Sequence, residues 1–259
     1  VLDGAPFEVT TLRRDVETDG RHAVVAFSRD FAEDVRRRDF TINALSLSRD
    51  GTVHDYATGI ADAAAGLVRF VGDPVQRIRE DYLRILRFFR FHASHGHGQP
   101  DPAGLAAATA LAPGVAQLSR ERIRQELLKL LAADGALAAV RTMAQIGLWP
   151  MIVPGSEPDI ASLERLVALS GTDQKDAILR LAALFSAPKA AASLQEKLVL
   201  SNRDHQRILA GLACAGEISG PAPTVVAIAR LVHRHGPASF RDGCLLAAAM
   251  QGWTRPAFE

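Results

Sequence analysis

The stretch from Ile78 to Phe91, IREDYLRILRFFRF, combines acidic, basic and aromatic side chains in a helical pattern. At about 100° per residue, its apolar side chains fall on one stripe, which we expect to face a core. This stripe consists of Ile78, Tyr82, Ile85, Leu86 and Phe89. A narrower second stripe consists of Arg77, Asp81, Arg84 and Phe88. We therefore predict an amphipathic helix that carries an acid and a base one turn apart.

Two interpretations of Asp81 and Arg84 are open. As i,i+3 neighbours they would form a surface ion pair, which stabilises a helix by only a few tenths of a kcal/mol. Alternatively, they face a planar ligand. A carboxylate that accepts from an exocyclic amine, beside a guanidinium that donates to a ring nitrogen, matches the Watson–Crick edges of cytosine and adenine. Guanine and uracil present a carbonyl beside an N–H, so the same pair would reject them.

On either side of this stretch the residue pattern changes from strands to helices, which predicts an α+β fold. Before residue 74 we expect strands at 7–12, 22–27 and 67–72, a charged loop at 14–20, and a hairpin that joins 44–48 to 52–56 across Asp50 and Gly51. After it, Gly, Pro, Asn and Asp separate helical segments. These are expected at 74–95, about 103–112, 119–133, 135–147, about 160–170, 174–186, 190–200, 203–216 and 223–235.

The segment VRRRDFTINALSL, residues 35–47, is the second candidate for chemistry. One interpretation is a solvated basic turn. The other is a cradle for the sugar and phosphates of a nucleotide, because arginine forks suit a triphosphate and Asp39 suits a ribose hydroxyl. Asn43 lies in an otherwise apolar stretch and would need a specific hydrogen-bond partner.

The segment SRERIRQELLKLL, residues 119–131, predicts a supporting helix. Ser119 is a plausible N-cap, Glu121 is an acid in the first turn, and Arg122 can pair with Glu126 at i,i+4. This helix would also brace the preceding one.

The composition argues against several classes of protein and of binding site. The net charge is +1, so any attraction to nucleic acid must come from local clustering of basic groups. Cys214 and Cys244 predict free thiols and neither a disulfide scaffold nor a zinc module. No apolar run approaches the roughly 20 residues that cross a bilayer, and we expect a cytoplasmic protein without a membrane partner. The histidines of residues 91–98 predict a loop and no metal site.

Three of these segments together resemble a known family. RRDFTINAL (37–45), EDYLR (80–84) and SRERIRQE (119–126) are similar, in this order, to motifs B, D and E of the class II tRNA nucleotidyltransferases (CCA-adding enzymes) and bacterial poly(A) polymerases. FEVTTLRRD (7–15) is also similar. The resemblance implies part of a nucleotidyltransferase (polymerase beta-like) head in 1–73, a helical neck with a nucleotide-templating helix in 74–150, and a helical, RNA-binding body and tail in 151–259.

By this resemblance, the protein adds CCA to the tRNA 3′ end and uses CTP and ATP. Asp81 and Arg84 would act as the protein template, oriented by Glu80, while Arg38 and Asp39 would handle the sugar and phosphates. The complete expected nucleotide-binding set is Arg37, Arg38, Asp39, Asn43, Arg77, Glu80, Asp81, Arg84 and Arg87. Two alternatives are poly(A) addition and a non-catalytic RNA- or nucleotide-binding module. The sequence leaves the oligomeric state open.

Nucleotidyl transfer also needs carboxylate ligands for divalent ions, which we expect to be Mg²⁺. In the family these come mainly from an aspartate pair upstream of the strand that resembles FEVTTLR, and no such pair precedes it here. Glu8 matches the position of an accessory catalytic and metal-binding carboxylate. We therefore expect a chain that lacks the N-terminal part of the head, binds nucleotide weakly, and transfers nothing by itself.

Overall fold

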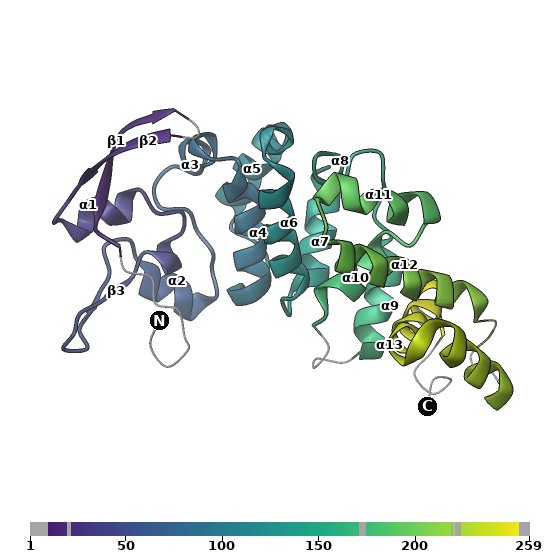
Figure 1. Cartoon of the computed structure of the whole chain (residues 1–259). Helices are drawn as coiled ribbons and strands as arrows, with labels where there is room; N and C mark the ends of the chain where they lie inside the picture. Colours follow the sequence, from purple (N-terminus) through teal and green to yellow (C-terminus); the bar gives the residue numbers. More distant parts are fainter. Residues whose placement is uncertain (1–9, 20–21, 171–174, 219, 221–223, 254–259) are drawn as a thin grey trace. The chain divides into compact units, whose positions relative to one another are not determined.

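The structure is a computed structural model that describes residues 10–19, 22–170, 175–218, 220 and 224–253. The chain divides into two compact units (Figure 1). The first comprises residues 1–84 and 95–111, and the second comprises 85–94 and 112–259. The predicted division into head, neck and body concerns functional segments and stays a prediction.

The first unit contains two small antiparallel sheets and several short helices. Its elements are β1 (Arg13–Asp19), β2 (His22–Phe27), α1 (Phe31–Arg36), the 3-10 helix η1 (Thr41–Asn43), β3 (Ser46–Leu47), β4 (Val53–His54), α2 (Gly59–Ala65), α3 (Pro74–Glu80) and α5 (Pro102–Leu111). β1 pairs with β2, with a register shift between Asp15 and Glu17, and β3 pairs with β4.

A small core holds the motif of residues 35–47 in place. Val35, Ala44 and Val71 are buried together, and the rings of Phe40 and Phe70 lie 4.9 Å apart. Gly59 lets α2 approach η1 closely, because a Cβ atom there would stand 2.3 Å from the carbonyl oxygen of Thr41.

The strand predictions have mixed outcomes. The hairpin is confirmed, with β3 and β4 joined by a turn in which the Ser48 N–H donates to Thr52. The charged loop predicted at 14–20 is wrong, since β1 covers residues 13–19. Of the strand predicted at 7–12, residues 10–12 are not in a strand and 7–9 lie outside the described residues. The strand predicted at 67–72 is reduced to a single bridge between Phe70 and Phe40.

The long helix predicted at 74–95 is interrupted, and that prediction is wrong. α3 ends at Glu80, Asp81 has extended backbone angles (φ −158°, ψ 108°), and α4 runs from Leu83 to His95. The Asp81 carboxylate accepts a hydrogen bond of 3.1 Å from the N–H of Leu83. Asp81 therefore acts as a local cap that starts a second helix, as aspartate does at helix N-termini.

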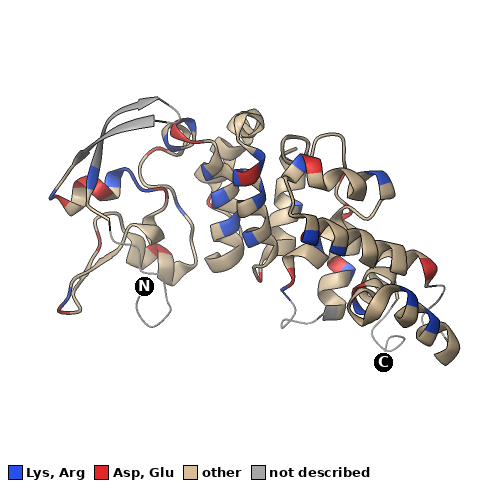
Figure 2. Ribbon diagram, in the orientation of Figure 1, with Lys and Arg blue, Asp and Glu red and all other residues tan. Residues whose placement is uncertain are grey.

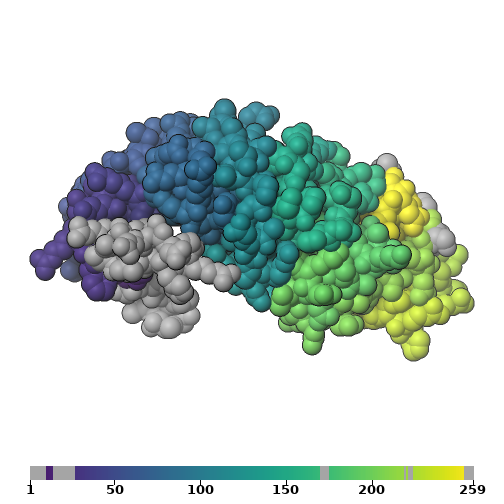
Figure 3. All heavy atoms as spheres, turned by 90° about the horizontal axis from the view of Figure 1, so that it is seen from above, coloured from purple at the N-terminus to yellow at the C-terminus, as the bar shows by residue number. Residues whose placement is uncertain are grey.

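The second unit is helical and contains most of α4. Its other elements are η2 (Ala112–Gln117), α6 (Arg120–Leu131), α7 (Ala136–Gln145), α8 (Trp149–Ile152), α9 (Ile160–Ser170), α10 (Ala177–Leu184), α11 (Pro188–Leu198), α12 (Asn202–Glu217) and α13 (Val225–Gln251). Phe88 and Phe89 of α4 are fully buried, and Trp149 packs edge-on against Phe185. Figure 3 shows the surface of α11 to α13 in green and yellow.

The helix predictions of this unit are largely confirmed, with shifts of a few residues at the ends. The helix predicted at 223–235 continues to residue 251 after a kink at Gly236 (φ 78°), which precedes Pro237. The short helices α1, α2 and α8 were not predicted. Cys214 and Cys244 are free thiols, as predicted. Among the described residues, no helix is long and apolar enough to cross a membrane. Figure 2 shows that basic and acidic residues are interspersed along the helices.

Candidate nucleotide-binding site

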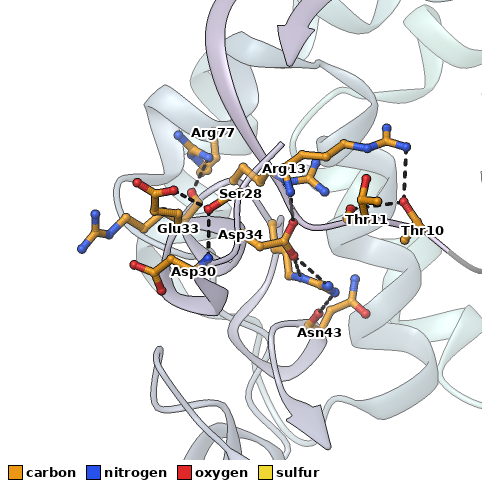
Figure 4. Close-up of polar contacts among 12 residues, drawn as sticks. Thr10, Thr11, Arg13, Ser28, Asp30, Glu33, Asp34, Asn43 and Arg77 are labelled. Atoms are coloured by element: carbon orange, nitrogen blue, oxygen red, sulfur yellow. Dashed lines mark hydrogen bonds and ion pairs between the residues drawn. The ribbon is translucent and has the colours of Figure 1, made fainter. Parts of the chain in front are cut away.

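The two arginines that follow α1, Arg37 and Arg38, both bind one buried carboxylate, Asp34, which Figure 4 labels. Nε of Arg37 donates to Oδ1 of Asp34 at 2.8 Å. Nε and Nη2 of Arg38 lie 2.9 Å from Oδ2. The backbone N–H of Arg13, at the start of β1, donates to Oδ1 at 3.2 Å. Asp34 is only 3% exposed, so this carboxylate links a strand to the arginine motif from inside the fold.

These hydrogen bonds keep Asp34 ionised. Burial by itself raises the pKa of this carboxyl group, because it removes water from the charged form. Hydrogen bonds from the Arg37 guanidinium, the Arg13 backbone and the Arg38 guanidinium outweigh burial and hold the pKa below its ordinary value. Asp34 is therefore the anion that balances two neighbouring cations.

Asp39 and Asn43 form a second buried arrangement in the same motif. The side-chain amide of Asn43 donates to Oδ1 of Asp39 at 2.9 Å, and the Phe40 N–H donates to the same oxygen at 3.0 Å. The Asn43 carbonyl accepts from Nη1 of Arg38 at 3.0 Å. The specific partner that the sequence required for Asn43 is thus Asp39. Because Asp39 is only 7% exposed, contact with a ribose stays a prediction.

Glu80 holds two arginines around the interruption between α3 and α4. One of its carboxylate oxygens pairs with Arg77 and the other accepts from Arg84 at 2.5 Å. Nη1 of Arg77 donates to the carbonyl of Arg36 at 2.8 Å, and Arg84 donates to the carbonyls of Arg77 at 2.8 Å and Arg37 at 3.2 Å. These bonds join the segment between α3 and α4 to the end of α1.

In the structure, Arg84 contacts Glu80 and two backbone carbonyls, which differs from the surface pair with Asp81 that the sequence allowed. Its ion pair is with Glu80, one turn earlier. Its side chain is only 16% exposed, and three of its hydrogen bonds go to protein oxygens. A guanidinium has five N–H groups, so donors remain for a ligand.

Arg87 and the segment 119–126 belong to the second unit. Glu126 of α6 is buried, and it accepts from Nε of Arg90 at 2.5 Å and lies 3.7 Å from Nη1 of Arg87. Both guanidinium groups lie over the ring of Phe91, at 4.2 Å for Arg90 and 5.4 Å for Arg87. Glu126 therefore connects α6 to α4.

The remaining predicted residues of α6 have supporting positions. Ser119 is the N-cap residue of α6, as predicted, with extended backbone, and its hydroxyl makes no capping hydrogen bond. Glu121 lies exposed in the first turn, and Arg122 is half-buried.

The metal prediction has no support in the described part of the chain. No group of three or more His, Cys, Asp or Glu side chains there could hold an ion. Glu8 lies outside the described residues. Two carboxylates of the candidate site, Asp34 and Glu80, are each paired with two arginines. These residues do not fit a metal centre.

Sequence reasoning missed Asp34. A usable signal was present, because Asp34 precedes Arg37 and Arg38 by three and four residues, the spacing at which side chains meet on a helix. Because α1 is only six residues long, hydrophobic periodicity does not reveal it as a helix.

Family models match two parts of the chain. A model described as the poly A polymerase head domain matches residues 2–69. A model described as the probable RNA and SrmB-binding site of polymerase A matches residues 99–160.

Two curated proteins that are similar to this chain are named as enzymes that add CCA to tRNA. The CCA tRNA nucleotidyltransferase 1, mitochondrial, of Danio rerio is 40% identical over 200 residues, which are 76% of this chain and 46% of that protein. The CCA-adding enzyme of Levilactobacillus brevis is 42% identical over 171 residues, which are 65% of this chain and 43% of that protein. The chain thus spans about half the length of the curated relatives it matches.

A solved structure of a CCA-adding enzyme has a similar fold. The Bacillus stearothermophilus CCA-adding enzyme, solved in complex with CTP, superposes with a TM-score of 0.76 at 27% identity. The match covers 99% of this chain and 62% of that one.

Proposed function

Because the chain belongs to the family of class II tRNA nucleotidyltransferases (CCA-adding enzymes) and bacterial poly(A) polymerases, we propose that its protein adds CCA to the 3′ end of tRNA from CTP and ATP. The observation that carries this proposal is the 40% identity over 200 residues to a CCA-adding enzyme. The family models and the fold point to the same nucleotidyltransferase family. The tRNA 3′ end is the proposed acceptor.

Within this proposal, Arg84 and Asp81 select the base. Arg84 is fixed by Glu80 and by two backbone carbonyls, and such fixed donors favour one hydrogen-bonding pattern over another. Asp81 supplies the acceptor from the adjacent interruption between the helices. Arg37 and Arg38 bind the phosphates, and Asp39 binds the ribose. Arg77 and Asn43 support this site from within the first unit. The nucleotide-binding role expected of Arg87 stays a prediction.

Mg²⁺ and a cytoplasmic location belong to the proposal as well. Nucleotidyl transfer needs a divalent ion to neutralise charge on the phosphates. Since the described residues do not form its site, we derive no step of the mechanism through it. The location is a prediction from the sequence, and the name of the Danio rerio relative places that protein in mitochondria.

Nucleotide binding tests the base-selecting residues. The chain should bind CTP and ATP more tightly than GTP and UTP in calorimetric titrations. Asp81→Ala and Arg84→Ala should each reduce this discrimination by about 1–3 kcal/mol, roughly 5- to 150-fold, because each removes one base-edge contact. Arg79→Ala is a matched control, since Arg79 is exposed on α3. Unchanged discrimination in both variants would refute the template role.

Product length separates the proposed activity from its alternatives. The complete protein that contains this chain is given tRNA lacking its 3′ end, first with CTP alone and then with ATP. Two cytidines followed by one adenosine support CCA addition. A long adenosine tail would indicate a poly(A) polymerase, and no extension with intact binding would indicate a non-catalytic module.

A further inference from the structure

One carboxylate at the proposed site has no assigned role. Asp34 lies beneath the arginines expected to bind the triphosphate, and its side chain is only 4% exposed, whereas those of Arg37 and Arg38 are 30% and 36% exposed. The acid is inside and the bases reach the surface. Direct contact between Asp34 and a nucleotide would also bring two anions together, so a role through the arginines is the physical alternative.

We propose that Asp34 is a positioning residue that aims Arg37 at the phosphates of the incoming nucleotide; this inference rests on the function proposed above. Asp34 binds Arg37 at Nε, on one edge of the planar guanidinium. No hydrogen bond within the described residues engages Nη1 or Nη2 of Arg37. These two nitrogens form the opposite fork, which is the edge that binds a phosphate with two parallel hydrogen bonds.

Arg38 has a different role in this arrangement. Its Nε and Nη2 lie against Asp34, and its Nη1 donates to the carbonyl of Asn43. Arg38 therefore locks the turn after α1 and has fewer N–H groups left for a ligand. Asp34 holds the two adjacent guanidinium groups with one oxygen each, which offsets the repulsion between two neighbouring cations. Without this anion, Arg37 would be free to turn away.

The test compares a nucleotide with and without phosphates. We would measure binding of CTP and of cytidine to the chain carrying Asp34→Asn, which keeps the shape of the side chain. CTP affinity should fall by about 10- to 100-fold, because a charged hydrogen bond loses its support, while cytidine affinity should stay unchanged. Glu33→Gln is the matched control. Glu33 is the neighbouring acid of α1 and its hydrogen bond is to the Ser28 hydroxyl, so CTP affinity should not change.

A double-mutant cycle identifies the route of the effect. In an Arg37→Met background, Asp34→Asn should have little further effect on CTP affinity, because the group that it positions is gone. Effects that add in full would overturn the inference, as would equal losses of CTP and cytidine affinity or unchanged CTP affinity in Asp34→Asn. Each of these outcomes leaves the proposed function standing. If the complete wild-type protein that contains this chain bound neither CTP nor cytidine, both proposals would instead be overturned.

Discussion

At the scale of single residues, the buried Asp34 makes stability depend on pH. Its folded-state pKa lies below the ordinary value of 3.8, so the unfolded chain takes up a proton first as the pH falls. The stabilisation is therefore complete above that ordinary value and is lost as the pH falls through the folded-state pKa. As the pH falls below this ordinary value, the free energy of unfolding should fall more steeply in the wild type than in Asp34→Asn. Urea unfolding at several pH values measures both curves; parallel curves would contradict the assigned ion pairs.

The contacts of single side chains could be predicted from the sequence only where a polar group lies in an apolar stretch and needs a hydrogen-bond partner. Asn43 needed one because it lies in an apolar stretch, and Asp39 is that partner. The resemblance implied that Glu80 orients Asp81 and Arg84; the structure pairs Glu80 with Arg84, and the orienting role stays a prediction. The sequence gives no reason to expect a buried partner for Asp34, because an acid in a short charged segment is usually exposed to solvent. Its burial is evident only from the structure. Burial of a polar group depends on distant chain segments, here the backbone of Arg13.

At the scale of helices, a buried arginine ends α6. Arg180 of α10 is 4% exposed and donates to the carbonyls of Leu131 at 2.6 Å and Ala133 at 2.9 Å. Arg180→Met should lower the free energy of unfolding by about 2–4 kcal/mol, because two buried carbonyls lose a charged donor. The matched control is Arg141→Met, whose exposed pair with Glu164 should contribute less than about 1 kcal/mol. Equal effects in urea unfolding would exclude the capping role.

The elements themselves could be predicted where hydrophobic periodicity was long and regular. α9 spans the expected residues 160–170 because its apolar stripe packs into the second unit. The same rule failed at Asp81, where the periodicity continues but the side chain caps a new helix. It failed again for β1, whose sequence RRDVETD is charged. Backbone pairing with β2 forms that strand, and side-chain pattern does not report such pairing.

At the scale of the whole molecule, charge is nearly balanced, with 30 Lys and Arg against 29 Asp and Glu. Figure 2 shows both signs distributed over the elements of each unit. Several arginines of the candidate site already pair with carboxylates or carbonyls. Because both signs are interspersed and these arginines are already paired, we expect a small number of phosphate contacts to account for the electrostatic part of RNA binding.

This charge balance predicts a shallow dependence of tRNA binding on salt. Each neutralised phosphate releases counterions, so the slope of log K against log salt counts the contacts. For roughly 2–4 contacts, affinity for tRNA lacking its 3′ end should fall by about 10- to 100-fold between about 50 and 200 mM salt. Fluorescence anisotropy with labelled tRNA measures the slope, and a single-stranded RNA of the same length serves as the comparison. A fall of about 1,000-fold or more would require a concentrated basic surface, which would contradict the balance of charge, and a flat response would exclude phosphate contacts altogether.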